Sequence, residues 1–278
     1  MTERFSRPSV TVLGLGRMGT ALVHGLLKAG WSRSCLRAVE TDPHAREHAR
    51  ETLRIIEVLA SPTATARTDV VVLAVKPKDT DAALDALSPF QWPDGSLLLS
   101  LAAGVSTKRL AVHWGTRPLA RAMPNLAATI GRAVSALYAT PASDEKARSW
   151  AASLLAAVGE VHWCAREEDL DAVTALSGSG IAYVLALMES MIEEGMALGL
   201  SQPLAERLVA GTVEATPALL AATGGDAAAL SARVASPGGT TEAALRVLAE
   251  GDFSPLVRSA VRAAWTRARS LRGDEVVS

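Results

Sequence analysis

The chain has 278 residues and a formal net charge of −1; 49% of its residues are hydrophobic and 4% are aromatic. This length is enough for two domains, and the low aromatic content predicts a core built mainly from Ala, Leu and Val. The charge is nearly balanced and contains no basic run, which argues against a nucleic-acid partner.

Other features of the sequence favour a reduced, cytoplasmic protein. The two cysteines, Cys35 and Cys164, lie far apart without the spacing of metal ligands, so we expect no metal site. The charged segment Met1–Ser9 leads directly into an apolar stretch and is not typical of a signal peptide. No apolar run approaches the roughly 20 residues of a membrane-spanning helix, so we expect no membrane partner.

The segment Val10–Leu27 carries the most informative motif. Val10–Leu13 is apolar and β-branched, as in a buried strand, and Ala21–Leu27 has helical spacing. Between them stands a G-x-G-x-x-G motif made of Gly14, Leu15, Gly16, Arg17, Met18 and Gly19. In dinucleotide-binding sites the three glycines permit a tight turn, close approach of the pyrophosphate and close helix packing, and the helix N-terminus attracts phosphate. The alternative is a glycine-rich turn that binds nothing.

The second predicted strand, Leu36–Glu40, ends in an acidic residue. Glu40 or Asp42 falls where a carboxylate would accept hydrogen bonds from the adenosine ribose hydroxyls. A carboxylate there repels the additional phosphate of NADP, so Glu40 weakly favours NADH. Arg46 and Arg50 leave NADPH open because either guanidinium could reach a phosphate. The alternative for the two acids is an ordinary solvated turn.

Further short apolar runs predict strands, and the segments between them predict helices. The strands are expected at Asp69–Ala74, Leu97–Leu101, Pro118–Met123, Ala133–Tyr138 and Val158–Trp163, and the helices include Asp79–Leu87 and Thr107–His113. This alternation predicts an α/β fold with a doubly wound parallel sheet of the Rossmann type.

Turn residues directly follow several of these strands. Ligands bind at the carboxyl ends of the strands in such sheets, so we expect these residues to line the cofactor groove. They are Ala74, Lys76, Pro77, Gly104 and Asn125. The alternative for Lys76 is a surface turn, and for Asn125 it is a turn or a helix cap.

The character of the sequence changes after Cys164, where Ala, Leu, Met and Glu dominate. Helices are expected at Asp169–Leu200, with an interruption at Ser177–Gly180, and at Pro203–Thr223 and Asp226–Ala235. The first is apolar on nearly all sides, and such a helix is normally buried. We therefore expect a dinucleotide-binding domain at residues 1–164 and an all-α dimerisation and substrate domain at residues 165–278. The assembly would be a homodimer or a higher oligomer of dimers.

A second glycine-rich turn precedes the expected helix Glu242–Glu250. Its residues are Ser236, Pro237, Gly238, Gly239, Thr240 and Thr241. Hydroxyl and glycine N–H groups meet a helix N-terminus here, an arrangement that binds anions. The alternative is a structural cap and turn, although a cap would need only one Ser or Thr.

Together these motifs resemble those of the pyrroline-5-carboxylate reductase family. The matching segments cover nearly the whole chain and read GLGRMG, LAVKP, RAMPN, ALSGSGIAYV and SPGGTTEAALRVLAEGDF. The resemblance implies an N-terminal Rossmann domain, a C-terminal helical domain that interlocks two subunits, and NADPH- or NADH-dependent reduction of 1-pyrroline-5-carboxylate to L-proline in proline biosynthesis. It also implies that the substrate's carboxylate and imine are held by Ser236, Gly239, Thr240 and Thr241.

Two positions depart from the pattern of this family. Leu126 stands where the family usually has Thr, in MPNTP, and Ile181 stands where it usually has Pro, in SGSGPAY. Leu126 removes a hydroxyl near the nicotinamide, and Ile181 adds a backbone N–H and a branched side chain beside the substrate. These changes leave open a related imine reductase that acts on another cyclic imine acid in secondary metabolism.

The distribution of lysine bears on the chemistry. Reduction of a carbonyl needs a proton donor such as Lys or His, but the chain has no Lys after Lys146. An iminium ion already carries its proton, so orientation and hydrogen bonds suffice. We expect Thr241 to bond the ring nitrogen, and the carboxylate to be bound by Ser236, Gly238, Gly239 and Thr240. A carbonyl-reducing dehydrogenase and a non-catalytic dinucleotide-binding regulator remain as alternatives.

Overall fold

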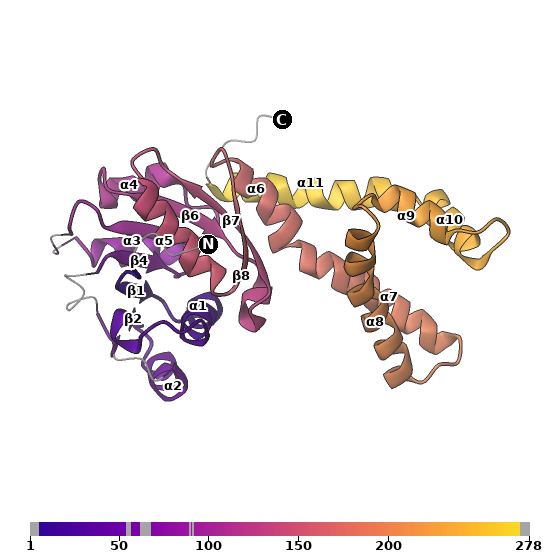
Figure 1. Cartoon of the computed structure of the whole chain (residues 1–278), viewed down its shortest axis with the longest axis horizontal. Coiled ribbons are helices and arrows are strands. Elements are labelled where there is room, and N and C mark those ends of the chain that lie inside the picture. The colour runs from indigo at the N-terminus through magenta and orange to yellow at the C-terminus, as the bar shows by residue number, and fades with distance from the viewer. Residues whose placement is uncertain (1–5, 54–56, 62–67, 89, 91, 273–278) are drawn as a thin grey trace. The chain divides into compact units, whose positions relative to one another are not determined.

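The computed structural model of the chain describes residues 6–53, 57–61, 68–88, 90 and 92–272. The chain divides into two compact units, both drawn in Figure 1. The first contains the residues up to Ser179 together with those from Ala264 onward, and the second contains Gly180–Ala263. Along the chain, the second unit is therefore inserted into the first.

The described part of the first unit is built on an eight-stranded sheet (Figure 1). Its strands are β1 (Val10–Leu13), β2 (Leu36–Val39), β3 (Glu57–Leu59), β4 (Val70–Leu73), β5 (Leu97–Ser100), β6 (Leu119–Met123), β7 (Ala133–Ala139) and β8 (Gly159–Trp163). They lie in the order β3-β2-β1-β4-β5-β6-β7-β8. Strands β1 to β6 are parallel, as predicted, but β7 runs antiparallel to β6 and pairs in parallel with β8. The predicted parallel sheet is therefore confirmed for β1 to β6 and does not extend to β7.

The reversal between β6 and β7 follows from the short connection between them. Only residues 124–132 separate the two strands, and a crossover between parallel strands needs about a dozen residues or more. Most of the connection is the 3-10 helix η3 (Leu126–Ile130), after which Gly131 turns the chain back with a φ of 72°. The sequence patterns also do not predict β3, whose three residues are too few to show an alternation.

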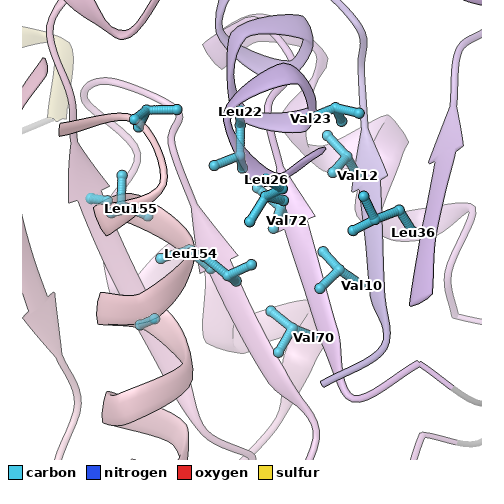
Figure 2. Close-up of a cluster of buried hydrophobic side chains, with 14 of the residues drawn as sticks. Val10, Val12, Leu22, Val23, Leu26, Leu36, Val70, Val72, Leu154 and Leu155 are labelled. Carbon is cyan, nitrogen blue, oxygen red and sulfur yellow. The ribbon is translucent and has the colours of Figure 1, made fainter. Parts of the chain in front are cut away.

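Helices cover both faces of the sheet. They are α1 (Arg17–Lys28), α2 (Pro43–Leu53), α3 (Thr80–Asp85), α4 (Thr107–Trp114) and α5 (Glu145–Ala156), with the 3-10 helices η1 (Arg33–Cys35) and η2 (Pro77–Asp79). Successive residues of a strand point to opposite faces. Accordingly, Val70 and Val72 join Leu26 of α1 in the buried cluster of Figure 2, and Val71 and Leu73 join a second cluster. The buried residues of both clusters are Ala, Leu and Val, as predicted, apart from Trp31, Trp92, Trp114 and Trp150.

The first unit extends beyond the domain boundary expected at Cys164. It also includes α6 (Asp169–Val173), the π-helical turn η4 (Thr174–Gly178) and the end of α11 (Phe253–Arg272). Two ion pairs account for the difference. Arg121 of β6 lies 2.7 Å from Glu167, and Arg272 lies 3.1 Å from Asp171. All four side chains are largely buried, so these contacts hold α6 and the end of α11 in the first unit.

The second unit consists of helices with much exposed apolar surface. It contains α7 (Gly180–Ala197), α8 (Gln202–Ala222), α9 (Ala227–Val234), α10 (Thr240–Glu250) and the first part of α11. Helix α7 packs against α8, yet only Ala205 and Val209 are buried among residues 180–263. Leu198, Leu256 and Val247 are 78%, 67% and 65% exposed. Apolar exposure on this scale is typical of a surface that contacts another protein chain.

One stretch also has the length and composition of a membrane span. Asp169–Ala197 comprises 29 helical residues and is apolar enough, by these criteria alone, to cross a bilayer. The expectation that no apolar run is long enough is therefore wrong. The helix continues through the π-helical turn, so that the interruption seen in the sequence does not shorten it. Length and composition are weak grounds for a membrane partner, because a helix at a subunit interface has the same character.

Candidate functional site

A cavity of about 450 Å³ lies at the carboxyl ends of β1, β2 and β4. We call it the strand-end pocket. Strand β1 lies between β2 and β4, at the point where the chain changes from one side of the sheet to the other. Open α/β sheets bind their ligands at this switch point. Of the predicted site residues, the pocket is lined by Gly14, Gly16, Glu40, Ala74 and Lys76.

The structure explains in a different way why each position of the G-x-G-x-x-G motif is a glycine. Gly14 has a φ of 90°, and its N–H donates to the carbonyl of Val39 at 2.8 Å. A Cβ on Gly19 would lie 2.0 Å from the carbonyl oxygen of Gly14, so only glycine lets α1 start this close to the turn. A Cβ on Gly16 would meet no atom within 4 Å. Gly16 therefore presents bare backbone to the pocket.

The carboxylate of Glu40 is held against the glycine-rich turn. One oxygen accepts a hydrogen bond from the N–H of Leu15 at 2.8 Å, and the other accepts from the N–H of Asp42 at 2.9 Å. The guanidinium of Arg46 donates to the carbonyl of Glu40 at 2.9 Å, and that of Arg50 donates to the carbonyl of Val58 at 3.2 Å. The negative charge of Glu40 thus lines the pocket, whereas neither arginine does.

The remaining predicted residues of the glycine-rich turn and the strand ends lie outside this pocket lining. They are Leu15, Arg17, Met18, Gly19, Pro77, Gly104 and Asn125. Lys76 has an extended conformation with a ψ of 149°, as expected before Pro77. Gly104 has a φ of 71°, and a Cβ there would lie 2.9 Å from the Cβ of Leu271. Gly104 therefore stands at a packing contact with the end of α11 and not in the pocket.

Several residues that line the strand-end pocket are not predicted from the sequence. They are Leu13, Val39, Thr41, Val75, Asp79, Ala82, Ala83 and Ala86. Leu13, Val39 and Val75 lie at strand ends, and the three alanines lie on or directly after α3. Small residues in the first α-helix after a strand end are a signal that could have identified this wall.

Asn125 contacts the segment that follows α6. Its side-chain N–H donates to the hydroxyl of Ser177 at 3.0 Å, and its side-chain oxygen accepts from the N–H of Val134 at 3.4 Å. Ser177 belongs to the π-helical turn η4. Asn125 itself is only 9% exposed, whereas Ser177 is half-buried and Val134 is 40% exposed, so both bonds are partly buried. The two departures from the family pattern flank these residues: Leu126 is 48% exposed, and Ile181 is half-buried in the first turn of α7.

The second glycine-rich turn, which we call the Ser236–Thr241 loop, forms a tight turn before α10. The N–H of Gly239 donates to the carbonyl of Ser236 at 3.0 Å, and Gly238 has a φ of 70°, as in a type II turn with Pro237 in second position. The N–H of Gly238 donates to the carboxylate of Glu242 at 2.7 Å. Both glycine N–H groups that we expect to bind a carboxylate are therefore already partnered.

Other donors remain at this loop. The first N–H groups of an α-helix have no intrahelical acceptor, and in α10 these include the N–H groups of Thr240 and Thr241. The side chains of Ser236 and Thr240 are exposed, and Thr241 is half-buried. The loop thus offers hydroxyl and N–H donors at the positive end of the helix dipole.

A buried ionic cluster, which the sequence does not predict, lies beside α4. The carboxylate of Glu167 accepts hydrogen bonds from the N–H and hydroxyl of Thr107 and from the guanidinium of Arg121. Burial raises the pKa of Glu167, but these bonds and the charge of Arg121 outweigh it and hold the pKa below its ordinary value. Among the residues that the structure describes, no group of three or more His, Cys, Asp or Glu is placed to hold a metal ion.

Comparison with known proteins identifies the family. Residues 167–271 match the model described as pyrroline-5-carboxylate reductase dimerisation, and residues 9–104 match that of NADP oxidoreductase, coenzyme F420-dependent. A pyrroline-5-carboxylate reductase of Pseudomonas aeruginosa is 38% identical over 269 residues, which cover 96% of this chain and 97% of the relative. The chain belongs to the pyrroline-5-carboxylate reductase family. The resemblance found in the sequence is confirmed.

Solved structures of this reductase family agree with the fold. A pyrroline-5-carboxylate reductase from Coxiella burnetii superposes with a TM-score of 0.88 at 31% identity, over 96% of this chain and 99% of that chain. A pyrroline carboxylate reductase from Plasmodium falciparum with NADP bound gives 0.85 at 26% identity, over 95% and 98%. The predicted Rossmann-type domain followed by a helical domain is thereby confirmed.

The family assignment also accounts for the exposed helices. The dimerisation model of the reductase family covers α6 to α10 and nearly all of α11. These helices carry most of the exposed large apolar side chains of the chain. The apolar composition of Asp169–Ala197 therefore has an explanation in subunit contact.

Proposed function

We propose that this chain reduces 1-pyrroline-5-carboxylate to L-proline with NADH or NADPH, the last step of proline biosynthesis. The reductase relatives, which match nearly the whole chain, support this activity. One structural observation carries it: a single chain holds both the strand-end pocket and, in the Ser236–Thr241 loop, a helix N-terminus with available donors. The pocket suits a dinucleotide, and the loop suits a small carboxylate.

The strand-end pocket fits a nicotinamide dinucleotide. The open space at Gly16 leaves room for a pyrophosphate to approach bare backbone, and the N-terminus of α1 would stabilise its charge. Glu40 would accept hydrogen bonds from a ribose, and Lys76 adds a positive charge at the rim. The other cofactor-binding residues that we propose lie in the same turn and at the strand ends: Gly14, Leu15, Arg17, Met18, Gly19, Ala74 and Pro77.

We further propose that Glu40 favours NADH over NADPH. Its carboxylate is fixed on the N–H of Leu15 and would repel a phosphate on the adenosine ribose. Arg46 and Arg50, which could compensate, are bound to backbone carbonyls. Wild-type kcat/KM should therefore be higher with NADH than with NADPH.

Glu40→Gln tests this preference, because glutamine removes the charge and its one oxygen still accepts from the N–H of Leu15, at the cost of the acceptor for the N–H of Asp42. The ratio of kcat/KM for NADPH to that for NADH should rise by about tenfold in this variant. Equal use of the two cofactors by the wild type, or an unchanged ratio in Glu40→Gln, would contradict the proposed role.

The substrate would be bound by the Ser236–Thr241 loop. We assign its carboxylate to the N–H groups of Thr240 and Thr241 and to the hydroxyls of Ser236 and Thr240. The hydroxyl of Thr241 accepts a hydrogen bond from the protonated ring nitrogen. When bound, the reduced nicotinamide supplies a hydride to the imine carbon. The C=N electron pair then moves to nitrogen, which keeps its proton and becomes a neutral amine, so the loop has only to bind and orient.

The deciding experiment combines a substrate panel with variants of Thr241. NADH and NADPH oxidation is followed with 1-pyrroline-5-carboxylate, piperideine carboxylates and uncharged pyrrolines. Thr241→Ala should lower turnover by roughly ten- to a thousandfold, the scale of losing one or more catalytic hydrogen bonds, and Thr241→Ser should retain most of it. An unchanged rate in Thr241→Ala would remove this residue from the mechanism.

The same panel separates the alternative function. Leu126 and Ile181 replace smaller or more rigid family residues, and a piperideine carboxylate reduced faster than 1-pyrroline-5-carboxylate would favour the related imine reductase. Failure to reduce any cyclic imine acid would contradict both enzymes.

We also propose that the protein is a cytoplasmic homodimer or a higher oligomer of dimers. Apolar residues exposed on the second unit, such as Leu198 and Leu256, would be covered by a second copy. Both cysteines, Cys35 and Cys164, are free, as in a reducing compartment. Light scattering at micromolar concentration measures the mass directly, and a monomer would contradict the dimer.

A further inference from the structure

The π-helical turn η4 lies where the sequence reads Thr174-Ala175-Leu176-Ser177-Gly178. Its wider hydrogen bond runs from the N–H of Ser179 to the carbonyl of Thr174, at 2.9 Å. Such turns are rare inside helices, and they occur frequently at functional sites. The turn lies just before Gly180 and Ile181, and the sequence predicts that Ile181 lies beside the substrate. What holds this turn in place therefore bears on catalysis.

The carboxyl end of β6 provides polar contacts to the turn. Asn125 donates to the hydroxyl of Ser177 at 3.0 Å, and that hydroxyl donates to the carbonyl of Val134 at 3.3 Å. The N–H of Val134 donates back to the side-chain oxygen of Asn125 at 3.4 Å. A hydroxyl can accept and donate at the same time, so the three residues form a closed ring of hydrogen bonds.

A steric contact from the same strand end meets the next residue of the turn. A Cβ on Gly178 would lie 2.9 Å from the terminal methyl of Met123. Any side chain at this position would displace Met123 or the turn. Two residues near the end of β6, Met123 and Asn125, thus contact two successive residues of η4, Ser177 and Gly178.

We propose that Asn125 is a positioning residue that holds the π-helical turn, and with it the backbone leading to Ile181, in the conformation that the imine substrate needs. This inference rests on the proposed function. In this role Asn125 acts on the substrate side through its hydrogen bond to Ser177, whereas its position after a strand end predicts a place in the cofactor groove. The two roles differ in which KM they affect.

The kinetic test uses Asn125→Ala, Ser177→Ala and the double variant. Asn125→Ala removes the donor that fixes the hydroxyl of Ser177, and Ser177→Ala leaves the buried amide of Asn125 without its acceptor. In each single variant kcat/KM for the imine acid should fall about tenfold, and KM for the cofactor should stay within about twofold. The double variant should be no worse than either single one, because both changes break the same ring. Ser177→Thr, which keeps the hydroxyl, should restore most of the activity.

Ser190→Ala is the matched control. Within the described residues, the hydroxyl of Ser190 donates to the carbonyl of Ala186, one turn earlier on α7, at 3.0 Å. This variant should keep wild-type kinetics. A rise in cofactor KM alone in Asn125→Ala, or additive losses in the double variant, would overturn the positioning role.

Hydrogen exchange makes the test independent of turnover. Exchange at the N–H of Ser179 reports the bond that defines the π-helical turn, and it should accelerate by about tenfold or more in Asn125→Ala and Ser177→Ala but not in Ser190→Ala. Unchanged exchange would overturn the proposal whatever the activity. Accelerated exchange in a protein whose wild type reduces no cyclic imine acid would instead sustain the structural role of Asn125 and contradict the proposed function.

Discussion

Replacing Glu167 by glutamine isolates the charge of the buried cluster at the end of β6. The side chains of Arg121 and Glu167 are 5% and 13% exposed, and they meet at 2.7 Å. Within the described residues, the Nε of Arg121 already lacks a hydrogen-bond partner. Glu167→Gln therefore leaves a buried guanidinium without its counter-charge, while the new amide oxygen still accepts from the N–H of Thr107.

The expected loss can be estimated from this burial. Removing one partner of a buried ion pair lowers the free energy of unfolding by about 3–5 kcal/mol. Because Glu167 is partly exposed, we expect a loss of about 3 kcal/mol. In a unit of this size, each kcal/mol lowers Tm by about 2–4 °C. Glu167→Gln should therefore lower Tm by about 6–12 °C, as followed by circular dichroism at neutral pH.

Two control variants test whether the loss of Tm comes from the buried ion pair and not from the loss of any carboxylate. Glu160→Gln changes an exposed carboxylate, 79% accessible, that pairs with His162, and it should shift Tm by less than about 2 °C. The double variant Arg121→Met with Glu167→Leu removes both charges and should recover a large part of the loss. Equal Tm values for Glu167→Gln and Glu160→Gln would refute the reasoning that this pair is a buried, stabilising contact.

Three further outcomes follow from the same structure. Since the folded-state pKa of Glu167 lies below its ordinary value of 4.5, the stabilisation it gives is present above that value and is lost as pH falls through the folded pKa. The Tm difference between wild type and Glu167→Gln should thus shrink below about pH 4.5; a constant difference would contradict the assignment. Gly19→Ala should unfold at a lower temperature than the wild type, because its Cβ would meet a backbone oxygen at 2.0 Å. Gly16→Ala should keep the wild-type Tm and raise the KM of the cofactor several-fold. The reverse pattern would contradict the roles given to the two glycines. Glu242→Gln keeps an acceptor for the loop but removes a negative charge beside the proposed carboxylate site, so the KM of the imine acid should fall about two- to fivefold at low ionic strength and less at high salt; no salt-dependent change would argue against substrate binding there.

Features encoded by neighbouring residues could be predicted from the sequence. The strand, glycine-rich turn and helix at Val10–Leu27 follow one another without interruption, and Gly14 and Gly19 have conformational and steric reasons within this segment. The strands that lead to the pocket are likewise predicted as short apolar runs, because both faces of the sheet are covered and every position is buried except Arg37 of β2. These predictions depend on contacts only a few residues apart in the chain.

Features that depend on distant contacts could not be predicted in this way. The direction of β7 depends on how β6 and β7 pair, and the ion pair of Arg121 with Glu167 joins residues 46 positions apart. The partner of Gly238 is an instructive exception. Gly239 is the N-cap of α10 and Glu242 stands three residues later, at the spacing of a capping box. That spacing predicts that the carboxylate accepts from a backbone N–H at the start of the helix, although the donor is Gly238 and not the N-cap residue itself.

The path of the chain has a consequence for synthesis. The Rossmann-type unit is completed only by the last turn of α11, where Leu271 packs on Gly104 and Arg272 pairs with Asp171. A nascent chain on the ribosome would therefore complete the unit that contains β1 only after the whole of the second unit had been synthesised. Cleavage within the last turn of α11 would remove contacts from the unit that holds the sheet, far away along the chain.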